Sequence, residues 1–557
     1  MGNTKHEVWT DYEVRIPMRD GITLAADVYR PTESRNGQRF PTILLRSPYN
    51  NRSADISILT ARYFAELGYS YVIIDVRGRG DSAGDFVAYR NDGADGYDSV
   101  EWCAVQDWCD GNVGTIGASY SGMIQWLTAL LQPPHLKTMI ALVSPSDPFV
   151  ESPTGTTNPM HICWAALTSG HGNQNIQLVN WIPIYEHLPL LTMDEAAGRS
   201  VPLWRQDLGH TRLDDYWDPL RYQNHYDRVN VPVMHISGWY DDEQIGTPMN
   251  YIGVTKNGAT DFARQNQKLL MGPWGHAVNT QSKIGEVDFG ATALIDLRAE
   301  QLAWFDRWLK GEEGDPAKEV PVRIFIMGQN AWRDEKEWPL ARTQWTHYYL
   351  HSLGSANGRF CDGTLSNTVP QDESPDHYRY DPARPVPFIT EPTSSQIGGP
   401  DDYASVERRD DVLVYVTEPM EQDTEITGPI TLELYAASTA VDTDFMAKLV
   451  DVYPTGFAQR LCDGMVRARF RNGMESPQLI EPGRAYKYAI DLWNTAQVFG
   501  RGHRIGLEVA SSAFPKYDRN LNTGEDLATA TRMVAAQQTV YHDTKRPSAL
   551  VLPVIPR

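Results

Sequence analysis

The chain has 557 residues, of which 50 are Lys or Arg and 71 are Asp or Glu, giving a formal net charge of −21. This length corresponds to roughly three or four domains, which excludes a single small binding module. The excess of negative charge makes nucleic acid and an anionic membrane surface unfavourable partners, so we expect the chain to bind neither.

The N-terminal residues contain no apolar stretch that could serve as a signal peptide. No run approaches the roughly 18 apolar residues that a membrane span needs, so we expect a cytoplasmic protein. Cys103 and Cys109, two of only five cysteines, indicate neither a disulfide framework nor a zinc site. The sequence lacks a Walker loop, a dinucleotide fingerprint and an HExxH motif, and it therefore implies no cofactor and no metal.

The first part of the chain alternates strand and helix signals. Strands are predicted at 41–45, 71–75 and 113–118, and helices at 54–67 and 99–108, the second preceded by an acidic, glycine-rich loop at 91–98. Such alternation indicates a mostly parallel sheet with helices on both faces. We assign residues 1–145 to the first part of this α/β core.

The pattern changes twice further along the chain. Residues 146–231 are irregular and helical, rich in Trp, Tyr, Pro and Asn, and we predict that they form an inserted cap. The α/β pattern returns over 232–345, with strands near 231–236 and 268–271. A helix follows whose apolar residues recur at helical spacing: Ile295, Ala299, Leu302, Phe305 and Leu309. In 346–557 apolar and polar residues alternate, as at 430–436, which predicts an antiparallel sandwich or jelly roll.

A serine-containing turn gives the strongest chemical signal. Ser119 lies between Gly117 and Gly122, where a predicted strand turns into a predicted helix. Such an elbow presents a hydroxyl at the carboxyl edge of a sheet, and the helix behind it directs the backbone N–H of Tyr120 towards an oxyanion above the serine. Ser121 replaces the second glycine of the strict G-x-S-x-G pattern, so a simple solvated turn is the competing interpretation.

A nucleophilic serine also needs an imidazole base and a carboxylate that orients it. Asp241 follows the predicted strand 233–237, and His276 follows 269–271. The order Ser119, Asp241, His276 is that of α/β-hydrolases. Taken singly, Asp241 could be a helix N-cap and His276 a packing residue, but their joint occurrence at strand ends favours a catalytic triad.

Five motifs together resemble a known family. They lie at 46–49 (Arg-Ser-Pro-Tyr), at 75–84, at the Ser119 elbow, at 238–241 (Gly-Trp-Tyr-Asp) and at 272–276 (Gly-Pro-Trp-Gly-His). In this order they resemble the bacterial cocaine esterase, α-amino-acid ester hydrolase and X-prolyl dipeptidyl-peptidase group of serine hydrolases. The resemblance spans essentially the whole chain. It implies an α/β-hydrolase core with an inserted helical cap and a C-terminal β jelly-roll domain.

The same resemblance implies roles for individual residues. Ser119 would be the nucleophile, His276 the base and Asp241 the residue that orients it. The hydroxyl of Tyr49 would join the Tyr120 N–H in the oxyanion hole. On this basis we expect hydrolysis of carboxylic esters, and of amides, through an acyl-enzyme intermediate, with a small-molecule ester or amide as the partner.

The acyl group is less well defined. The predicted cap carries aromatic residues that could face an apolar acyl group or fill the cap's own core: Trp164, Trp181, Tyr185, Trp204, Tyr216 and Trp217. Trp164 and Trp239 are our candidates for substrate contact. Glu243 is a candidate for binding a substrate ammonium, although Gln244 interrupts the acidic cluster that the resemblance to amino-acid ester hydrolases would place there.

Other functions remain open. The acyl-enzyme could pass its acyl group to an amine or alcohol, as in β-lactam acylase-type transfer. An X-prolyl exopeptidase is disfavoured, because relatives with that activity carry an additional N-terminal domain for which we see no room. A carbohydrate- or partner-binding protein with a vestigial core is the non-enzymatic alternative, and a homo-oligomer is also compatible with the sequence.

Overall fold

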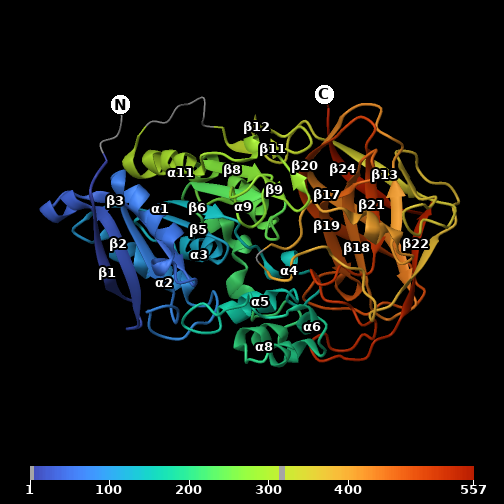
Figure 1. The fold of residues 1–557 in the computed structure, drawn as a ribbon, viewed down its shortest axis with the longest axis horizontal. Helices are drawn as coiled ribbons and strands as arrows, with labels where there is room; N and C mark the ends of the chain where they lie inside the picture. Colours follow the sequence, from blue (N-terminus) through green and yellow to red (C-terminus); the bar gives the residue numbers. More distant parts are fainter. Residues whose placement is uncertain (1–4, 313–319, 395, 557) are drawn as a thin grey trace.

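The computed structural model describes residues 5–312, 320–394 and 396–556. Two sheets lie side by side: a mixed sheet built from the first two thirds of the chain, and an all-β part built from the rest (Figure 1). Helices of residues 143–232 lie towards the bottom of this view, except α4 (Pro148–Glu151), which lies near the middle. Within the described ranges, no helix combines the length and apolar character that a membrane span requires.

The first sheet has the strand order β1-β2-β4-β3-β5-β6-β7-β8-β11-β12. Its strands are β1 (Val8–Pro17), β2 (Thr23–Pro31), β3 (Phe40–Ser47), β4 (Ser70–Asp75), β5 (Cys109–Ala118), β6 (Leu136–Leu142), β7 (Val233–Gly238), β8 (Gln267–Gly272), β11 (Val322–Ile326) and β12 (Ala331–Glu335). In this order the strands from β4 through β3 to β11 pair in parallel. Strands β1, β2 and β12 add antiparallel edges. Because β5, β7 and β8 are parallel and close together, the loops at their carboxyl ends share one edge.

Helices cover this sheet as the alternation predicted. They are α1 (Asp55–Glu66), α2 (Asp92–Ala104), α3 (Tyr120–Ala129), α9 (Gly246–Asn257), α10 (Asp261–Gln265) and α11 (Leu297–Phe305), which continues as a π-helix over Asp306–Lys310. The apolar stripe of α11 packs on the sheet, since Phe305 and Leu309 are buried in the same cluster as residues of β3 and β4. A Cβ added to Gly114 of β5 would lie 2.9 Å from the Phe305 ring. The glycine therefore allows α11 to pack closely against β5.

Helix α2 begins earlier than the sequence suggested. The acidic segment 91–98, expected as a loop, forms its first turns. The buried Arg46 guanidinium donates to Asp92 Oδ1 at 2.7 Å, and a Cβ on Gly96 would lie 1.9 Å from Thr128 Oγ1. The buried ion pair and the close approach to α3 therefore override the low helix propensity of this segment.

Residues 146–231, all of which the structure describes, form short helices and turns and no strand. The α-helices are α4 (Pro148–Glu151), α5 (His161–Leu167), α6 (Ile182–Tyr185), α7 (Met193–Ala196) and α8 (Pro202–Leu208). Trp181, Tyr185 and Trp204 are buried together with Phe388 and Tyr517 of the all-β part. The inserted segment therefore packs on the second half of the chain as well as on the first.

The all-β part contains one extensively paired set of strands around its own core. The strands are β13 (Gln344–His351), β14 (Thr364–Ser366), β15 (Asp376–Tyr380), β16 (Leu413–Val416), β17 (Thr424–Ser438), β18 (Asp444–Val452), β19 (Ala458–Arg467), β20 (Tyr486–Phe499), β21 (Arg504–Ala510), β22 (Ala536–Asp543), β23 (Arg546–Pro547) and β24 (Ala549–Ile555). Earlier in the chain, β9 (Lys283–Ile284) and β10 (Val287–Asp288) form a separate pair. The alternation predicted at 430–436 is that of β17, whose Ile430, Leu432 and Leu434 are fully buried.

Candidate active site

Ser119 occupies a sharp turn between β5 and α3. Its backbone has φ 59° and ψ −127°, an uncommon conformation for a residue with a side chain. A Cβ on Gly117 would lie 2.4 Å from the Ser121 carbonyl oxygen, and one on Gly122 would lie 2.7 Å from that of Leu142. Small residues on both sides are therefore necessary for this turn, as the sequence indicated.

His276 and Asp241 meet at the same edge of the sheet. The Nδ1 atom of His276 lies 2.8 Å from Asp241 Oδ1, and Ser237 Oγ donates to Asp241 Oδ2 at 2.7 Å. The Asp241 side chain is fully buried, whereas that of His276 is 23% exposed. Because Nδ1 faces the carboxylate, Nε2 is the ring nitrogen that can accept a proton from a reacting group.

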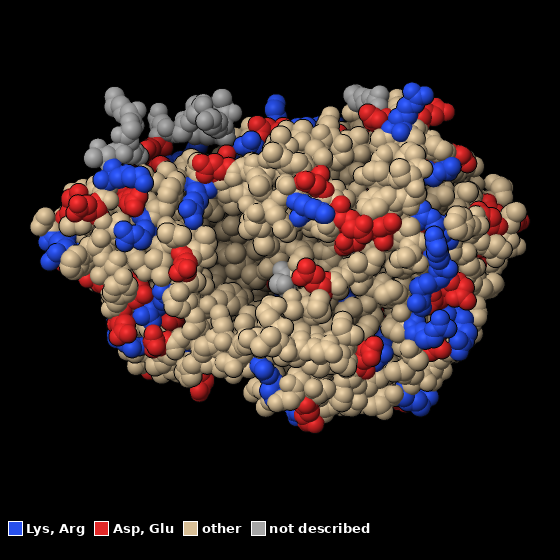
Figure 2. All heavy atoms as spheres, viewed as in Figure 1, with Lys and Arg blue, Asp and Glu red and all other residues tan. Residues whose placement is uncertain are grey.

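Ser119 and His276 line one cavity of about 180 Å³. The loop and helix residues of the α/β part, the inserted segment and the all-β part all contribute to its wall. Among its lining residues are Tyr89, Met123, Phe149, Glu151, His161, Trp164, Leu203, Tyr216, Trp217, Asp242, Glu243, Ile397, Trp493 and Lys516. Figure 2 shows the surface hollowed near the middle of the face drawn, where Figure 1 draws α3 and α9.

Tyr49 is held beside Ser119 by the inserted segment. The indole Nε1 of Trp164 donates to the Tyr49 hydroxyl at 2.9 Å, and the Ser119 side chain is close enough to act on the pKa of the same hydroxyl. Burial raises the pKa of Tyr49, so its hydroxyl keeps its proton. With an acceptor lone pair taken by Trp164, the phenolic proton is free to donate towards Ser119.

The Tyr120 side chain points away from the cavity, so only its backbone N–H faces the serine. Its hydroxyl donates to Asp92 Oδ2 at 2.5 Å, and its ring stacks on that of Tyr89 at a centroid distance of 4.3 Å. Tyr120 is the first residue of α3, where amide groups have no intrahelical acceptor. The N–H of Tyr120 therefore lies where a helix N-terminus favours negative charge.

Three carboxyl groups line the cavity near His276: Glu151, Asp242 and Glu243. Burial, with mutual repulsion, raises the pKa of Glu151 to about 8 and that of Asp242 to about 6, and it raises the pKa of Glu243 well above its usual range. Burial alone would lower the pKa of His276, but the charge of Glu243, the hydrogen bond to Asp241 and the charge of Asp242 outweigh it and raise that pKa. The site thus gathers carboxyl groups beside the imidazole, and the protonation of these groups is linked to that of His276.

Our aromatic candidates for substrate contact fall in different places. Trp164, Tyr216 and Trp217 line the cavity. Trp181, Tyr185 and Trp204 lie in the core of the inserted segment, the alternative that the sequence left open. Trp239 is not among the lining residues: it is 3% exposed, its Nε1 donates to the Phe325 carbonyl at 2.8 Å, and its ring packs on Trp338. The structure therefore places the Trp239 indole against β11 and outside the lining of this cavity, contrary to our expectation that it faces substrate.

Several residues of the site had no predicted role. Buried Arg79 donates to the Pro48 carbonyl at 2.8 Å and to the Thr168 carbonyl at 2.9 Å, which ties the Tyr49 loop to the inserted segment. Gln396 accepts from the His276 backbone N–H at 3.0 Å. The family motif at 75–84 contained Arg79, but no sequence signal assigned Gln396 or Glu151 to the site.

Asp241, Asp242 and His276 also form a group whose donor atoms lie within 4.8 Å of one another, close enough in principle for one metal ion. His276 Nδ1 lies at hydrogen-bond distance from Asp241 and 3.6 Å from Asp242 Oδ1. The nitrogen nearest the carboxylates is thus already paired with one of them. This geometry fits an oriented imidazole better than an ion between separated ligands.

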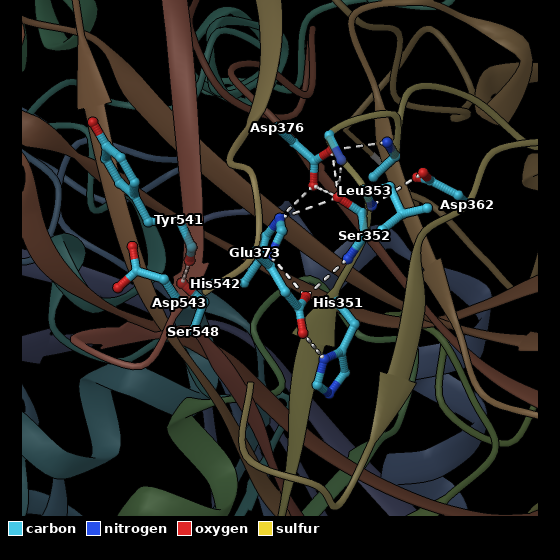
Figure 3. Close-up of polar contacts among 12 residues, drawn as sticks. His351, Ser352, Leu353, Asp362, Glu373, Asp376, Tyr541, His542, Asp543 and Ser548 are labelled. Atoms are coloured by element: carbon cyan, nitrogen blue, oxygen red, sulfur yellow. Dashed lines mark hydrogen bonds and ion pairs between the residues drawn. The ribbon is translucent and has the colours of Figure 1, made fainter. Parts of the chain in front are cut away.

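A second serine, histidine and aspartate meet in the all-β part, as Figure 3 shows. His542 Nε2 lies 2.9 Å from Asp376 Oδ2 and 3.2 Å from Ser352 Oγ. The Ser352 hydroxyl lies 2.8 Å from each oxygen of Asp376. His542 and Asp376 are fully buried and Ser352 is 5% exposed. None of the three is among the residues that line the cavity of Ser119 and His276.

Comparisons with known proteins agree with this architecture. Residues 20–278 match the X-Pro dipeptidyl-peptidase (S15 family), and residues 317–551 match the X-Pro dipeptidyl-peptidase C-terminal non-catalytic domain. The sequence is 36% identical to the cocaine esterase of Rhodococcus sp. (strain MB1 Bresler), over 98% of each chain.

Solved structures are similar over the whole length. An α-amino-acid ester hydrolase superposes with a TM-score of 0.87 at 26% identity, covering 100% of this chain and 98% of its own. An aminopeptidase from a marine sediment Thaumarchaeota archaeon superposes with a TM-score of 0.88 at 24% identity, covering 99% and 97%. The second likeness supports the fold alone. The expected α/β-hydrolase fold with a C-terminal all-β domain is confirmed.

Proposed function

Because the chain belongs to the serine-hydrolase family that includes cocaine esterase and the X-Pro dipeptidyl-peptidases, we propose that it hydrolyses carboxylic esters through an acyl-enzyme formed on Ser119. In this proposal His276 is the general base and Asp241 orients it. The Tyr49 hydroxyl and the Tyr120 N–H form the oxyanion hole. The observation that carries the proposal is that Ser119 and the Asp241-bound imidazole of His276 line the same cavity.

The geometry supports each step of acyl transfer. As Ser119 Oγ attacks the acyl carbon, His276 Nε2 takes its proton, and Asp241 stabilises the imidazolium. The negative charge that develops on the carbonyl oxygen is met by the Tyr49 hydroxyl and the Tyr120 amide. His276 then gives the proton to the leaving oxygen, and a water molecule, activated by the same imidazole, releases the acid.

The cavity chemistry favours an acyl group that carries an amine. Among the described residues, Asp242 Oδ1 and Glu243 Oε2 have no hydrogen-bond partner, although both atoms are buried. An ammonium would stabilise the ionised forms of these carboxylates and of Glu151, whose pKa values are raised in its absence. Trp164, Tyr216 and Trp217 supply aromatic surface beside them. We therefore propose esters of aromatic α-amino acids as the substrate class.

Two experiments test these proposals separately. A fluorophosphonate probe should label the protein, and Ser119→Ala should abolish the labelling; labelling that persists in the variant would contradict the assignment of the nucleophile. Phenylglycine methyl ester should have a higher kcat/KM than methyl phenylacetate, which lacks the amine, and Glu243→Gln should reduce the ratio. Equal kcat/KM values for the two esters would remove the proposed amine preference and leave the triad assignment intact.

A further inference from the structure

Trp493 sits in a strained bulge of the all-β part. Asp491 and Asn494 of β20 pair with Thr431 and Pro429 of β17, so two residues of β20, Leu492 and Trp493, oppose one residue of β17. Trp493 has φ 67°, which is a rare conformation for a bulky residue. Bulges of this kind redirect a side chain, and strain is retained where the surrounding structure holds it.

The neighbouring strand is built to accept the bulge. Asp491 Oδ1 accepts the Trp493 backbone N–H at 2.8 Å. A Cβ on Gly464 of β19 would lie 1.8 Å from the Asp491 carbonyl oxygen, so a residue with a side chain would displace the bulged strand. The Trp493 side chain lines the catalytic cavity and is 7% exposed. The all-β part thus places a large aromatic ring in the site through a backbone conformation that is unfavourable for a bulky residue.

Contacts locate this ring at the side of the cavity formed by the triad loops. The Gln244 amide, three residues after Asp241, donates to the Asn494 carbonyl at 2.6 Å and accepts from the Asn494 N–H at 3.3 Å. The residue that interrupts the acidic run after Asp241 therefore fastens the bulge to the loop that carries the triad acid. Trp493 is adjacent to Asn494 and is held next to this loop.

Lys516 fixes the ring from the other side. Its Nζ lies 4.9 Å from the centroid of the Trp493 ring and donates to Asp463 Oδ2 at 2.7 Å. The Asp242 charge also acts on Lys516, and Asp242 lies 3.6 Å from His276 Nδ1. A different set of contacts, those of Trp164 and Tyr49, holds the oxyanion donor. Trp493 therefore belongs with His276 rather than with the oxyanion hole.

In acyl transfer the imidazole gives its proton to the departing oxygen, so the leaving group lies on the histidine side of the reacting carbon. We propose that Trp493 is a specificity-determining residue that binds the leaving group, and that it favours a flat aromatic alcohol over a small aliphatic one. This inference rests on the proposed function of Ser119 and His276. Asp463 pairs with the Lys516 ammonium, so the surface offered to the leaving group is the indole face rather than an unpaired charge.

The test compares phenyl and methyl esters of phenylacetic acid, which share one acyl-enzyme but differ in the leaving group. Trp493→Gly removes the ring and suits the positive φ, so the fold should be retained. We expect kcat/KM for the phenyl ester to fall about tenfold relative to the wild type, and that for the methyl ester to change less than about twofold. Trp493→Phe should keep most of the preference. The rate of deacylation should not change, because the leaving group has already departed.

Gln132→Gly is the matched control, since Gln132 also has a positive φ, 52°, but is exposed and does not line the cavity. It should leave both esters unchanged. Equal losses for both esters in Trp493→Gly, or a slower deacylation step, would overturn the leaving-group assignment in favour of a general structural or acyl-side role. Fluorophosphonate labelling of Trp493→Gly at the wild-type rate would show at the same time that the Ser119 site is intact. Failure of this inference is thereby distinguished from failure of the proposed function.

Discussion

The part of the chain that the structure describes holds two groupings of serine, histidine and aspartate, and their comparison indicates what such residues need for catalysis. In both, an imidazole nitrogen lies within 3 Å of a buried carboxylate: His276 at 2.8 Å from Asp241 and His542 at 2.9 Å from Asp376. In both, burial would lower the pKa of the histidine, but the neighbouring carboxylates raise it. Residue types and the acid–imidazole contact therefore do not distinguish the two.

The difference lies in the remaining partners of the imidazole. His542 has a carboxylate at each nitrogen, with Nδ1 3.3 Å from Glu373 and Nε2 facing Asp376. Ser352 donates to Asp376 rather than presenting its hydroxyl to a free imidazole nitrogen. His276 keeps Nε2 for the cavity, and Ser119 is raised on a strained turn at a helix N-terminus. In our proposal, access, a free nitrogen and an oxyanion site separate the reactive group from the structural one.

The largest expected effect would separate the two serines. Ser119→Ala should lower kcat/KM for an ester substrate by about 10⁵-fold, because the acyl-enzyme can no longer form. Ser352→Ala, the matched control, should leave kcat/KM within about twofold. Steady-state kinetics with purified variants would check both. If Ser352→Ala abolished turnover in a protein that remains folded, the contrast between the groupings would be wrong.

The two aspartates should differ in the property that they affect. Asp241→Asn should lower kcat by about 10⁴-fold with little loss of stability, since the neutral amide cannot stabilise the imidazolium and favours the wrong tautomer of His276. Asp376→Asn should instead destabilise the protein by about 3 kcal/mol, because His542 would lose a fully buried partner. Chemical denaturation, combined with kcat per mole of folded protein, measures both quantities. A large fall in kcat per mole of folded protein for Asp376→Asn would contradict this division.

A smaller effect is expected at the proposed oxyanion hole. The second grouping does not line the cavity and so cannot use this hole. Tyr49→Phe removes one of two proposed donors while leaving the ring in place, so kcat should fall about 10²-fold. KM should change little, because the donor acts mainly on the developing charge. The change should also leave fluorescence and melting temperature close to those of the wild type. An unchanged kcat would show that the Tyr49 hydroxyl does not meet the oxyanion.

The sequence predicted the parts of the site that depend on local signals. The elbow requires small residues at Gly117 and Gly122, and Asp241 and His276 directly follow buried strands, so these positions could be identified from neighbouring residues alone. The fold followed from the periods of the apolar residues, which are set by helix and strand geometry.

The remaining parts depend on contacts between distant segments. Glu151 and Trp493 lie far apart in the sequence, and their positions in the cavity depend on how the inserted segment and the all-β part dock. Gln244 could be interpreted only as an interruption of an acidic run, because its partner Asn494 lies 250 residues away. The predicted start of α2 was wrong for the same reason, since Arg46 of β3 stabilises the first turn of this helix.

The smallest effect concerns pH and tests the charge around the reactive histidine. His276 must be neutral to act as a base, and the charges of Glu243, Asp241 and Asp242 favour its protonated form. The rising limb of kcat/KM should therefore lie above the usual pKa of a histidine, near 6.5. Glu243→Gln removes one of these charges, lowers the pKa of His276 and should move the limb to lower pH by about one unit.

Methyl phenylacetate is the appropriate substrate for this measurement, because a neutral ester does not itself titrate with the carboxylates. Asp207→Asn is the matched control: Asp207 also lines the cavity, but it is hydrogen-bonded to Tyr216 and is not among the groups with the largest influence on the pKa of His276. The rising limb of kcat/KM for Asp207→Asn should stay at the wild-type pH. Equal displacement in both variants would mean that the pH dependence reports the total charge of the cavity, and the specific influence of Glu243 on His276 would have to be abandoned.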